Sequence, residues 1–317
     1  MLRTAVTDLL GIDVPVVGAP MTGVAGGRLA AAVSAGGGLG MVGVGGSTEA
    51  AAIRDECQSA RRAGRPFGIG LMAWVLERRP DQFDAALEAE PQLVSVSFGN
   101  YAPWVDRLHE SGIKVATQVG DVDAARAAAD DRVDVVVARG AEAGGHGSDA
   151  VATLPLLQGV LDAVEVPVLA AGGIATARGL AAVLAAGAAG AWVGSVLLAC
   201  PEATNTPEAR ARVCAAAQTD TVYSRVFDIA QGIAWPPEYG GRALHNEFTD
   251  RWIGREGELA DDHAARDQLS TARETADYDT AYIYAGQAVG LVKRERSATE
   301  IVARLAEGAE QLLSLWR

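Results

Sequence analysis

A single histidine lies in a glycine-rich segment, RGAEAGGHG, which spans residues 139–147. Glycine has no side chain, so a flat ring can approach the backbone closely there. His146 adds a group with a reference pKa of about 6.5, which can take up or release a proton near neutral pH. We therefore predict that His146 is a functional, catalytic residue. His109, His245 and His263 have no such surroundings and are predicted to be structural.

Two more glycine-containing segments could bind an anion. They are AAGGI (residues 170–174) and VGS (residues 193–195). Glycine lets backbone N–H groups approach a phosphate, and the Ser195 hydroxyl adds a donor. No basic residue is close in sequence, so backbone dipoles would do most of the binding. Either segment alone could be a tight turn without a ligand, but both together predict a phosphate-bearing ligand.

These residues follow strands of a repeating pattern, in which apolar runs alternate with alanine-rich helical segments. The predicted strands are 14–20, 38–45, 67–72, 92–98, 113–119, 133–139, 166–172 and 190–195. Because the runs are almost continuously apolar, both faces of the sheet should be covered. Eight such units predict a closed (β/α)₈ TIM barrel of the α/β class, with an open doubly wound sheet as the alternative. In a barrel, the loops after the strands carry the active site, which brings His146 and both glycine-containing segments to one face.

No linker interrupts the series, so we predict a single domain over residues 1–317. The barrel should span about 14–217, and a loop or lid with a helical extension should span about 218–317. The aromatic stretch 223–248 is predicted to be a long structureless loop near the site. Residues 38–43 match GxGxxG, but they follow a helical pattern and lie in a predicted strand, so they do not indicate a dinucleotide site.

Composition argues against several classes of function and site. The chain has 27 Lys and Arg against 40 Asp and Glu, a net charge of −13, which disfavours nucleic acid and anionic membranes. Three cysteines without CxxC spacing suggest neither disulfides nor a zinc site, and favour a reducing cytoplasm. The uncharged stretch 179–200 is long enough to span a bilayer. Its Ala and Gly content fits a helix, a turn and a buried strand better, so we do not expect it to cross a membrane.

Five segments together resemble the nitronate monooxygenase family, formerly called 2-nitropropane dioxygenases. They are VGAPM (17–21), RGAEAGGHG (139–147), PVLAAGGI (167–174), GAAGAWVGS (187–195) and GQAVGLV (286–292). The motifs keep the family's order, and AGGH is the most specific. The resemblance implies a TIM-barrel flavoprotein with FMN and a histidine base. The cofactor-binding residues it implies are Ala19, Pro20, Met21, Gly70, Gln118, Arg139, Gly144, Gly145, Gly172, Gly173, Trp192, Val193, Gly194 and Ser195.

Three positions depart from the family pattern. Gly18 and Arg139 stand where the family often has Gln, and Gly70 stands where it often has Asn. We hypothesise that Arg139 partly replaces a lost contact and stabilises negative charge on the reduced flavin. The alternative is an outward-facing salt bridge to Glu142. Residues that could form the substrate pocket, or simply pack in the core, are Met21, Met72, Trp74, Phe98, Tyr223 and Trp235.

The activity that the resemblance implies is the oxidation of nitronates or nitroalkanes by O₂ to a carbonyl compound and nitrite. The alternatives are an NAD(P)H-dependent flavin reductase, of the enoyl-acyl-carrier-protein or quinone type, and a flavin-binding protein without turnover. A phosphosugar isomerase remains if no flavin binds. The expected partners are a small-molecule substrate and O₂, with no nucleic acid and no membrane, and a homo-oligomer is left open.

Overall fold

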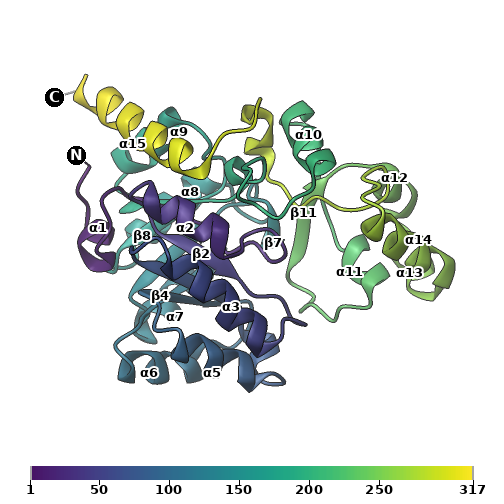
Figure 1. Cartoon of the computed structure of the whole chain (residues 1–317), viewed down its shortest axis with the longest axis horizontal. Helices are drawn as coiled ribbons and strands as arrows, with labels where there is room; N and C mark the ends of the chain where they lie inside the picture. Colours follow the sequence, from purple (N-terminus) through teal and green to yellow (C-terminus); the bar gives the residue numbers. More distant parts are fainter. Residues whose placement is uncertain (1, 316–317) are drawn as a thin grey trace.

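The computed structural model describes residues 2–315, and within them eight parallel strands form a barrel (Figure 1). The strands are β1 (Val16–Gly18), β2 (Gly40–Gly43), β3 (Phe67–Met72), β4 (Leu93–Ser97), β5 (Lys114–Val119), β6 (Val135–Arg139), β8 (Val168–Ala171) and β9 (Gly190–Val193). Their order is β1-β9-β8-β6-β5-β4-β3-β2, and a parallel bridge between Val17 and Leu39 joins the two ends. The predicted TIM barrel and its eight strands are therefore confirmed.

Helices cover the outside of the barrel. They are α2 (Gly27–Ala35), α3 (Ala50–Arg61), α4 (Ala73–Leu76), α5 (Pro80–Glu88), α6 (Ala102–Glu110), α7 (Val122–Asp130), α8 (Thr153–Leu161) and α9 (Ala177–Ala185). Side chains cap several of them, as where Asp121 accepts from the Ala124 N–H at the start of α7. The first helix, α1 (Ala5–Leu10), packs Val6 and Leu10 against the apolar side chains inside the barrel.

The GxGxxG match at residues 38–43 lies largely within β2, as predicted. A Cβ atom on Gly40 would lie only 1.9 Å from the carbonyl oxygen of Ala30 on α2. This glycine therefore allows a helix to approach the strand closely, which is a packing role.

The stretch 223–248 is not a structureless loop, so that prediction is wrong. It contains the second half of β10 (Thr221–Ser224), then α11 (Val226–Gln231) and β11 (Gly240–Leu244). Strand β11 pairs antiparallel with β10 on one side and with β7 (Gly145–Gly147) on the other. The histidine segment thus supplies one edge of a three-stranded sheet, and its backbone groups pair with a segment far along the chain.

The rest of the C-terminal part forms a helical lid beside the barrel and then returns to it (Figure 1). After the turn η1 (Ser195–Leu197), its elements are α10 (Pro207–Ala215), α12 (Glu247–Trp252), α13 (Glu256–Asp261), α14 (His263–Glu274), η2 (Gln287–Leu291) and α15 (Ala298–Ser314). We use the name lid for residues 221–284, whose core includes Phe227, Phe248, Trp252 and Leu269.

The last helix, α15, packs against α9 and α2. It therefore fills the outer position between the last and the first barrel helices.

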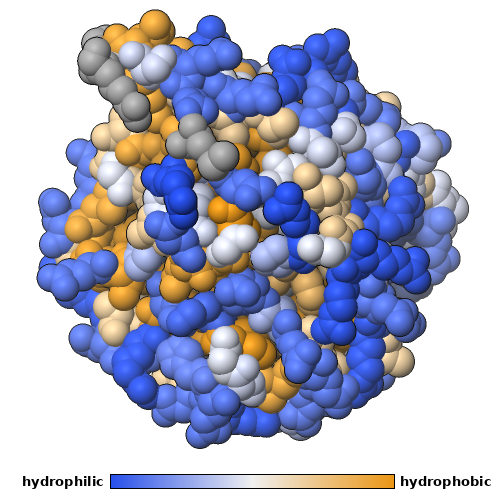
Figure 2. Space-filling view, turned by 60° about the vertical axis from the view of Figure 1, so that its left-hand side comes forward, coloured by the Kyte–Doolittle hydropathy of each residue, from blue (hydrophilic) through white to orange (hydrophobic). Residues whose placement is uncertain are grey.

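Figure 2 shows a largely hydrophilic face with hydrophobic residues gathered in places between the charged ones. None of the helices in residues 2–315 is long and apolar enough to cross a membrane. The uncharged stretch 179–200 forms most of α9, a turn, β9 and η1. Cys57 and Cys200 are buried and Cys214 is half-buried, all three as free thiols.

Candidate active site

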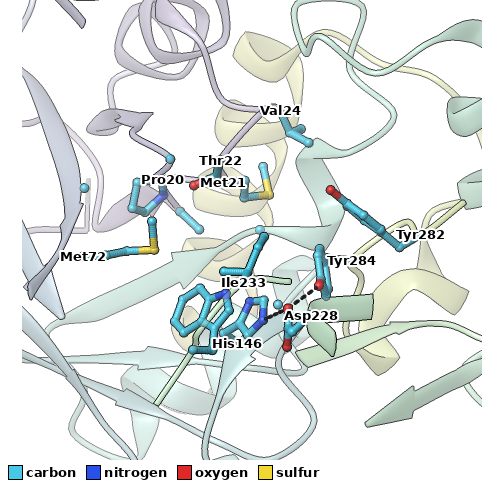
Figure 3. A pocket seen from close by; sticks show the side chains of 18 of the residues that line it. Pro20, Met21, Thr22, Val24, Met72, His146, Asp228, Ile233, Tyr282 and Tyr284 are labelled. Atoms are coloured by element: carbon cyan, nitrogen blue, oxygen red, sulfur yellow. Dashed lines mark hydrogen bonds and ion pairs between the residues drawn. The ribbon is translucent and has the colours of Figure 1, made fainter. Parts of the chain in front are cut away.

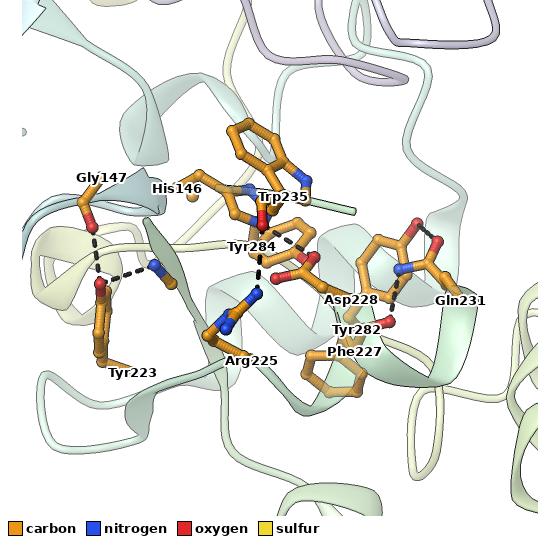
Figure 4. Close-up of polar contacts among 12 residues, drawn as sticks. His146, Gly147, Tyr223, Arg225, Phe227, Asp228, Gln231, Trp235, Tyr282 and Tyr284 are labelled. Carbon is orange, nitrogen blue, oxygen red and sulfur yellow. Dashed lines mark hydrogen bonds and ion pairs between the residues drawn. The ribbon is translucent and has the colours of Figure 1, made fainter. Parts of the chain in front are cut away.

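A cavity of about 1330 Å³ opens at the carboxyl ends of the strands, between the barrel and the lid. The predicted cofactor-binding residues that line it are Ala19, Pro20, Met21, Gly70, Gln118, Arg139, Gly144, Gly145, Gly172, Gly173, Trp192, Gly194 and Ser195. Met72, Trp74, Phe98 and Trp235 also line it. Among the described residues, Val193 lies in the barrel core and Tyr223 lies outside the lining. The Tyr223 hydroxyl instead donates to the Gly147 carbonyl oxygen and accepts from the Gly240 N–H (Figure 4).

His146 lies on one wall of this cavity and is held by a residue of the lid. Its Nε2 atom is 2.9 Å from Oδ1 of Asp228, and the side chains of His146 and Asp228 are 11% and 2% exposed. An N–H on Nε2 can donate to this carboxylate, which leaves Nδ1 as the ring nitrogen able to accept a proton. Figure 3 shows Pro20, Met21 and Met72 across the cavity from the His146–Asp228 pair.

The two carboxylate oxygens of Asp228 differ in their hydrogen bonds. Oδ2 is buried and has no hydrogen-bond partner in the described part of the chain. The hydroxyl of Tyr284 donates to Oδ1 at 3.3 Å. Burial, together with the nearby Asp228 carboxylate, raises the pKa of Tyr284 well above its ordinary value, so Tyr284 keeps its proton and can donate.

An indole covers the imidazole of His146. The Trp235 ring is stacked on it, with centroids 3.8 Å apart and planes 5° from parallel. Trp235 in turn contacts Trp74 and Phe98, at centroid distances of 5.4 and 5.3 Å. Its carbonyl oxygen accepts from Arg225 at 3.2 Å (Figure 4). The lid therefore contributes both the carboxylate and the aromatic face that fix the orientation of the histidine.

Arg139 is buried and points into its own loop. Its guanidinium donates to the carbonyl oxygens of Ala143, Gly144, Gly145 and Ser148, at 2.8–3.2 Å. Burial lowers the pKa of this group to about 10. The predicted outward-facing salt bridge to Glu142 is wrong, because Arg139 is only 4% exposed and the Glu142 carboxylate accepts from the Thr153 N–H instead.

Glycines on two strand-end loops form a cradle beside this segment. Gly172 and Gly173 have φ values of +114° and +73°, which favour glycine. Their amides donate to no other group in the described part of the chain. Nearby, Ser195 Oγ accepts from the Gly286 N–H at 2.8 Å, so its own hydroxyl proton stays free to donate. These donors can bind an anionic group of a ligand.

The sequence analysis missed Asp228, Tyr284 and Gly286. Asp228 is one of 40 acidic residues and lies in a segment without a recognisable motif. Gly286 begins the GQAVGLV motif, which was noted only as a resemblance. A Cβ atom on Gly286 would lie 2.5 Å from the carbonyl oxygen of Glu142, so this glycine allows the late motif to pack against the histidine segment. The remaining histidines contact surface carboxylates or are exposed, as where His109 contacts Asp134.

Comparison with known proteins agrees with this geometry. The family model for nitronate monooxygenase matches residues 3–86 and 77–308. A nitronate monooxygenase of Neurospora crassa is 34% identical over 93% of this chain and 89% of its own length. FabK from Thermotoga maritima has a TM-score of 0.87 at 28% identity, and covers 100% of this chain and 99% of its own. Nitroalkane oxidase from Streptomyces ansochromogenes has a TM-score of 0.84 at 28% identity, covering 99% of this chain and all of its own. The chain belongs to the nitronate monooxygenase family of flavin-dependent oxidoreductases.

Proposed function

We propose that this protein uses FMN and O₂ to oxidise nitronates and small nitroalkanes to a carbonyl compound and nitrite. The single observation that carries the proposal is the position of His146. It lies on the cavity wall opposite Pro20, Met21 and Met72, with Nε2 bound to Asp228 and Nδ1 left to accept a proton. Family membership supports the class of substrate.

The residues present fit a flavin mononucleotide. The free amides of Gly172 and Gly173 and the hydroxyl of Ser195 can bind its phosphate. Gly70 leaves room beside Pro20, since a Cβ atom there would lie 2.3 Å from the proline ring. When bound, the flavin supplies the acceptor for electrons from the nitronate and passes them to O₂.

His146 should affect the oxidation of neutral nitroalkanes and of nitronates differently. In its neutral form, with the Nε2 proton donated to Asp228, Nδ1 can remove the α-proton of a neutral nitroalkane. A nitronate arrives without that proton and needs no base. A positioned base contributes about 10²–10⁴ in rate, so His146 should matter mainly for neutral nitroalkanes.

The aromatic side chains around His146 exclude water from the reacting face. Trp235 covers the imidazole, and Trp74 and Phe98 pack against Trp235. A dry site strengthens the His146–Asp228 interaction and the attraction between an anionic substrate and fixed dipoles. We infer a cytoplasmic location from the three free cysteines.

The test is anaerobic mixing of FMN-loaded protein with ethylnitronate and, separately, with NADH, while the visible flavin absorbance is followed. Bleaching by the nitronate but not by NADH is expected. Rapid bleaching by NADH alone would reassign the protein as a flavin reductase. A yellow protein that responds to neither would be a flavin-binding protein without this turnover.

A further inference from the structure

One face of α14 lines the part of the cavity that the lid encloses. Arg266, Ser270 and Arg273 all line the cavity and are spaced by four and three residues. Residues at this spacing lie on the same side of a helix. Two arginine side chains therefore reach the cavity from one helix, Arg266 half-buried and Arg273 exposed.

Neither arginine is neutralised by a carboxylate in the described part of the chain. Arg273 donates to Gln231 Oε1 at 3.0 Å, and its guanidinium lies 5.1 Å from the ring centroid of Tyr282. Arg266 donates to the Ala260 carbonyl oxygen, while its Nε is buried without a partner. Asp267 also lines the cavity, but no ion pair joins it to either arginine among the described residues. In a chain with net charge −13, an unpaired cationic pair in one cavity favours an anionic ligand.

A continuous wall connects these arginines to the reacting histidine. The Tyr282 hydroxyl donates to Gln231 Oε1, the same oxygen that accepts from Arg273 (Figure 4). The Tyr282 and Tyr284 rings are 4.9 Å apart, and Tyr284 reaches Asp228. Apolar residues of the lid line the same cavity along this wall, namely Ala230, Ile233, Leu269, Ala281 and Ile283.

The cavity is also larger than a typical site for one small ligand. Its volume of about 1330 Å³ exceeds the range of about 300–1,000 Å³ typical of small-molecule sites. The part lined by α14 is thus available to a substrate that reaches beyond His146.

We propose that Arg266 and Arg273 form an anion subsite for the tail of an elongated substrate, in which an apolar chain separates the reacting carbon from a terminal phosphate or carboxylate. The inference rests on the proposed function for the identity of the reacting carbon, but not for the subsite itself. The apolar chain would lie along the lid residues, and the terminal anion would lie between the two guanidinium groups.

The test is equilibrium binding of unreactive ligands to the FMN-loaded protein, measured by calorimetry. The probes are n-alkyl phosphates and n-alkanoates from ethyl to decyl, with the n-alkanols of the same length as uncharged controls. We expect both anions to bind more tightly than the alkanol, by about 5-fold per arginine, and to lose that advantage in high salt. The two series decide whether phosphate or carboxylate is preferred.

Two variants and a control separate charge from packing. Arg266→Gln with Arg273→Gln should reduce anion binding to that of the alkanol, whereas Arg273→Lys should retain most of it. Arg294→Gln removes one charge from an exposed position away from the cavity, and should leave binding unchanged. Equal binding of anion and alkanol, or no effect of the double variant, would overturn the subsite. Since binding needs no turnover, a failed nitronate assay would leave this result standing.

Discussion

Asp228 Oδ1 lies 2.9 Å from His146 Nε2, although the two residues are 82 positions apart in the chain. His146 belongs to β7 on the barrel side, and Asp228 belongs to α11 of the lid. The base is therefore oriented only when the lid is in place. A carboxylate in this position fixes which ring nitrogen carries the proton, and so fixes which one can accept another.

Replacing His146 by Asn should separate neutral from anionic substrates. We expect His146→Asn to lower kcat/KM for nitroethane by about 10²–10⁴, because no base remains to remove the α-proton. For ethylnitronate the loss should be much smaller. Oxygen consumption with each substrate measures both, and equal losses would show that His146 does not act as a base on carbon.

Asp228→Asn should retain the volume of the side chain but lose the charge that orients His146. We expect kcat for nitroethane to fall at least about 10-fold, with little change in KM, since substrate contacts are preserved. The matched control is Asp250→Asn, which alters the exposed His245–Asp250 pair on the same lid. That control should have wild-type kinetics, and a similar loss in both variants would mean that Asp228 acts only through lid stability.

Trp235→Leu tests the aromatic cover on the imidazole. A stacked aromatic pair is worth about 0.5–1.5 kcal/mol beyond its buried area, so the orientation of His146 should weaken by a factor of about 2 to 13. We expect kcat/KM for nitroethane to fall within that range while FMN binding is retained. An unchanged steady-state rate in the variant would remove Trp235 from the list of positioning residues.

Arg139→Gln should destabilise the histidine segment. Four backbone carbonyl groups lose a charged donor in a buried site, which should lower the free energy of unfolding by about 3 kcal/mol. Urea unfolding of the flavin-free protein measures this. The exposed Arg126→Gln should change it by no more than about 0.5 kcal/mol.

The hypothesis that Arg139 also stabilises the reduced flavin needs its own measurement. If it does, Arg139→Lys should retain a flavin reduction potential closer to wild type than Arg139→Ala, because the charge is kept. Normal FMN binding with unchanged reduction kinetics and potential in Arg139→Ala would exclude that role.

The raised pKa of Tyr284 predicts that the folded protein loses stability at alkaline pH. Burial, then the Asp228 carboxylate, raises its pKa in the folded protein, so its contribution is fully present below the unfolded value of about 10. It is lost as the pH rises further, because the unfolded chain releases the proton more easily. We expect the Tm of Tyr284→Phe to fall less steeply above pH about 10 than that of wild type. Tyr278→Phe, at a half-buried tyrosine bonded to Thr206, is the control and should follow the wild-type slope.

The barrel was predictable because its strands are continuous apolar runs, a local property of the sequence. His146 was identified for a similar reason, since its glycines adjoin it. Asp228 was not, because its partner is distant in sequence and a lone acidic residue carries no signal. The pairing of β11 with β7 is equally non-local, which is why the stretch 223–248 was predicted as a loop. Arg139 was recognised as unusual, but the residue type alone could not show that it points into its own loop.

The position of α15 has a consequence for how the chain is made. On the ribosome, all eight barrel strands and then the lid emerge before the helix that packs against α9 and α2. The surface of α9 and α2 that α15 covers is therefore exposed while the lid is synthesised. Because the lid lies between the barrel strands and α15 in the chain, α15 can cover this part of the wall only after the whole lid has been synthesised.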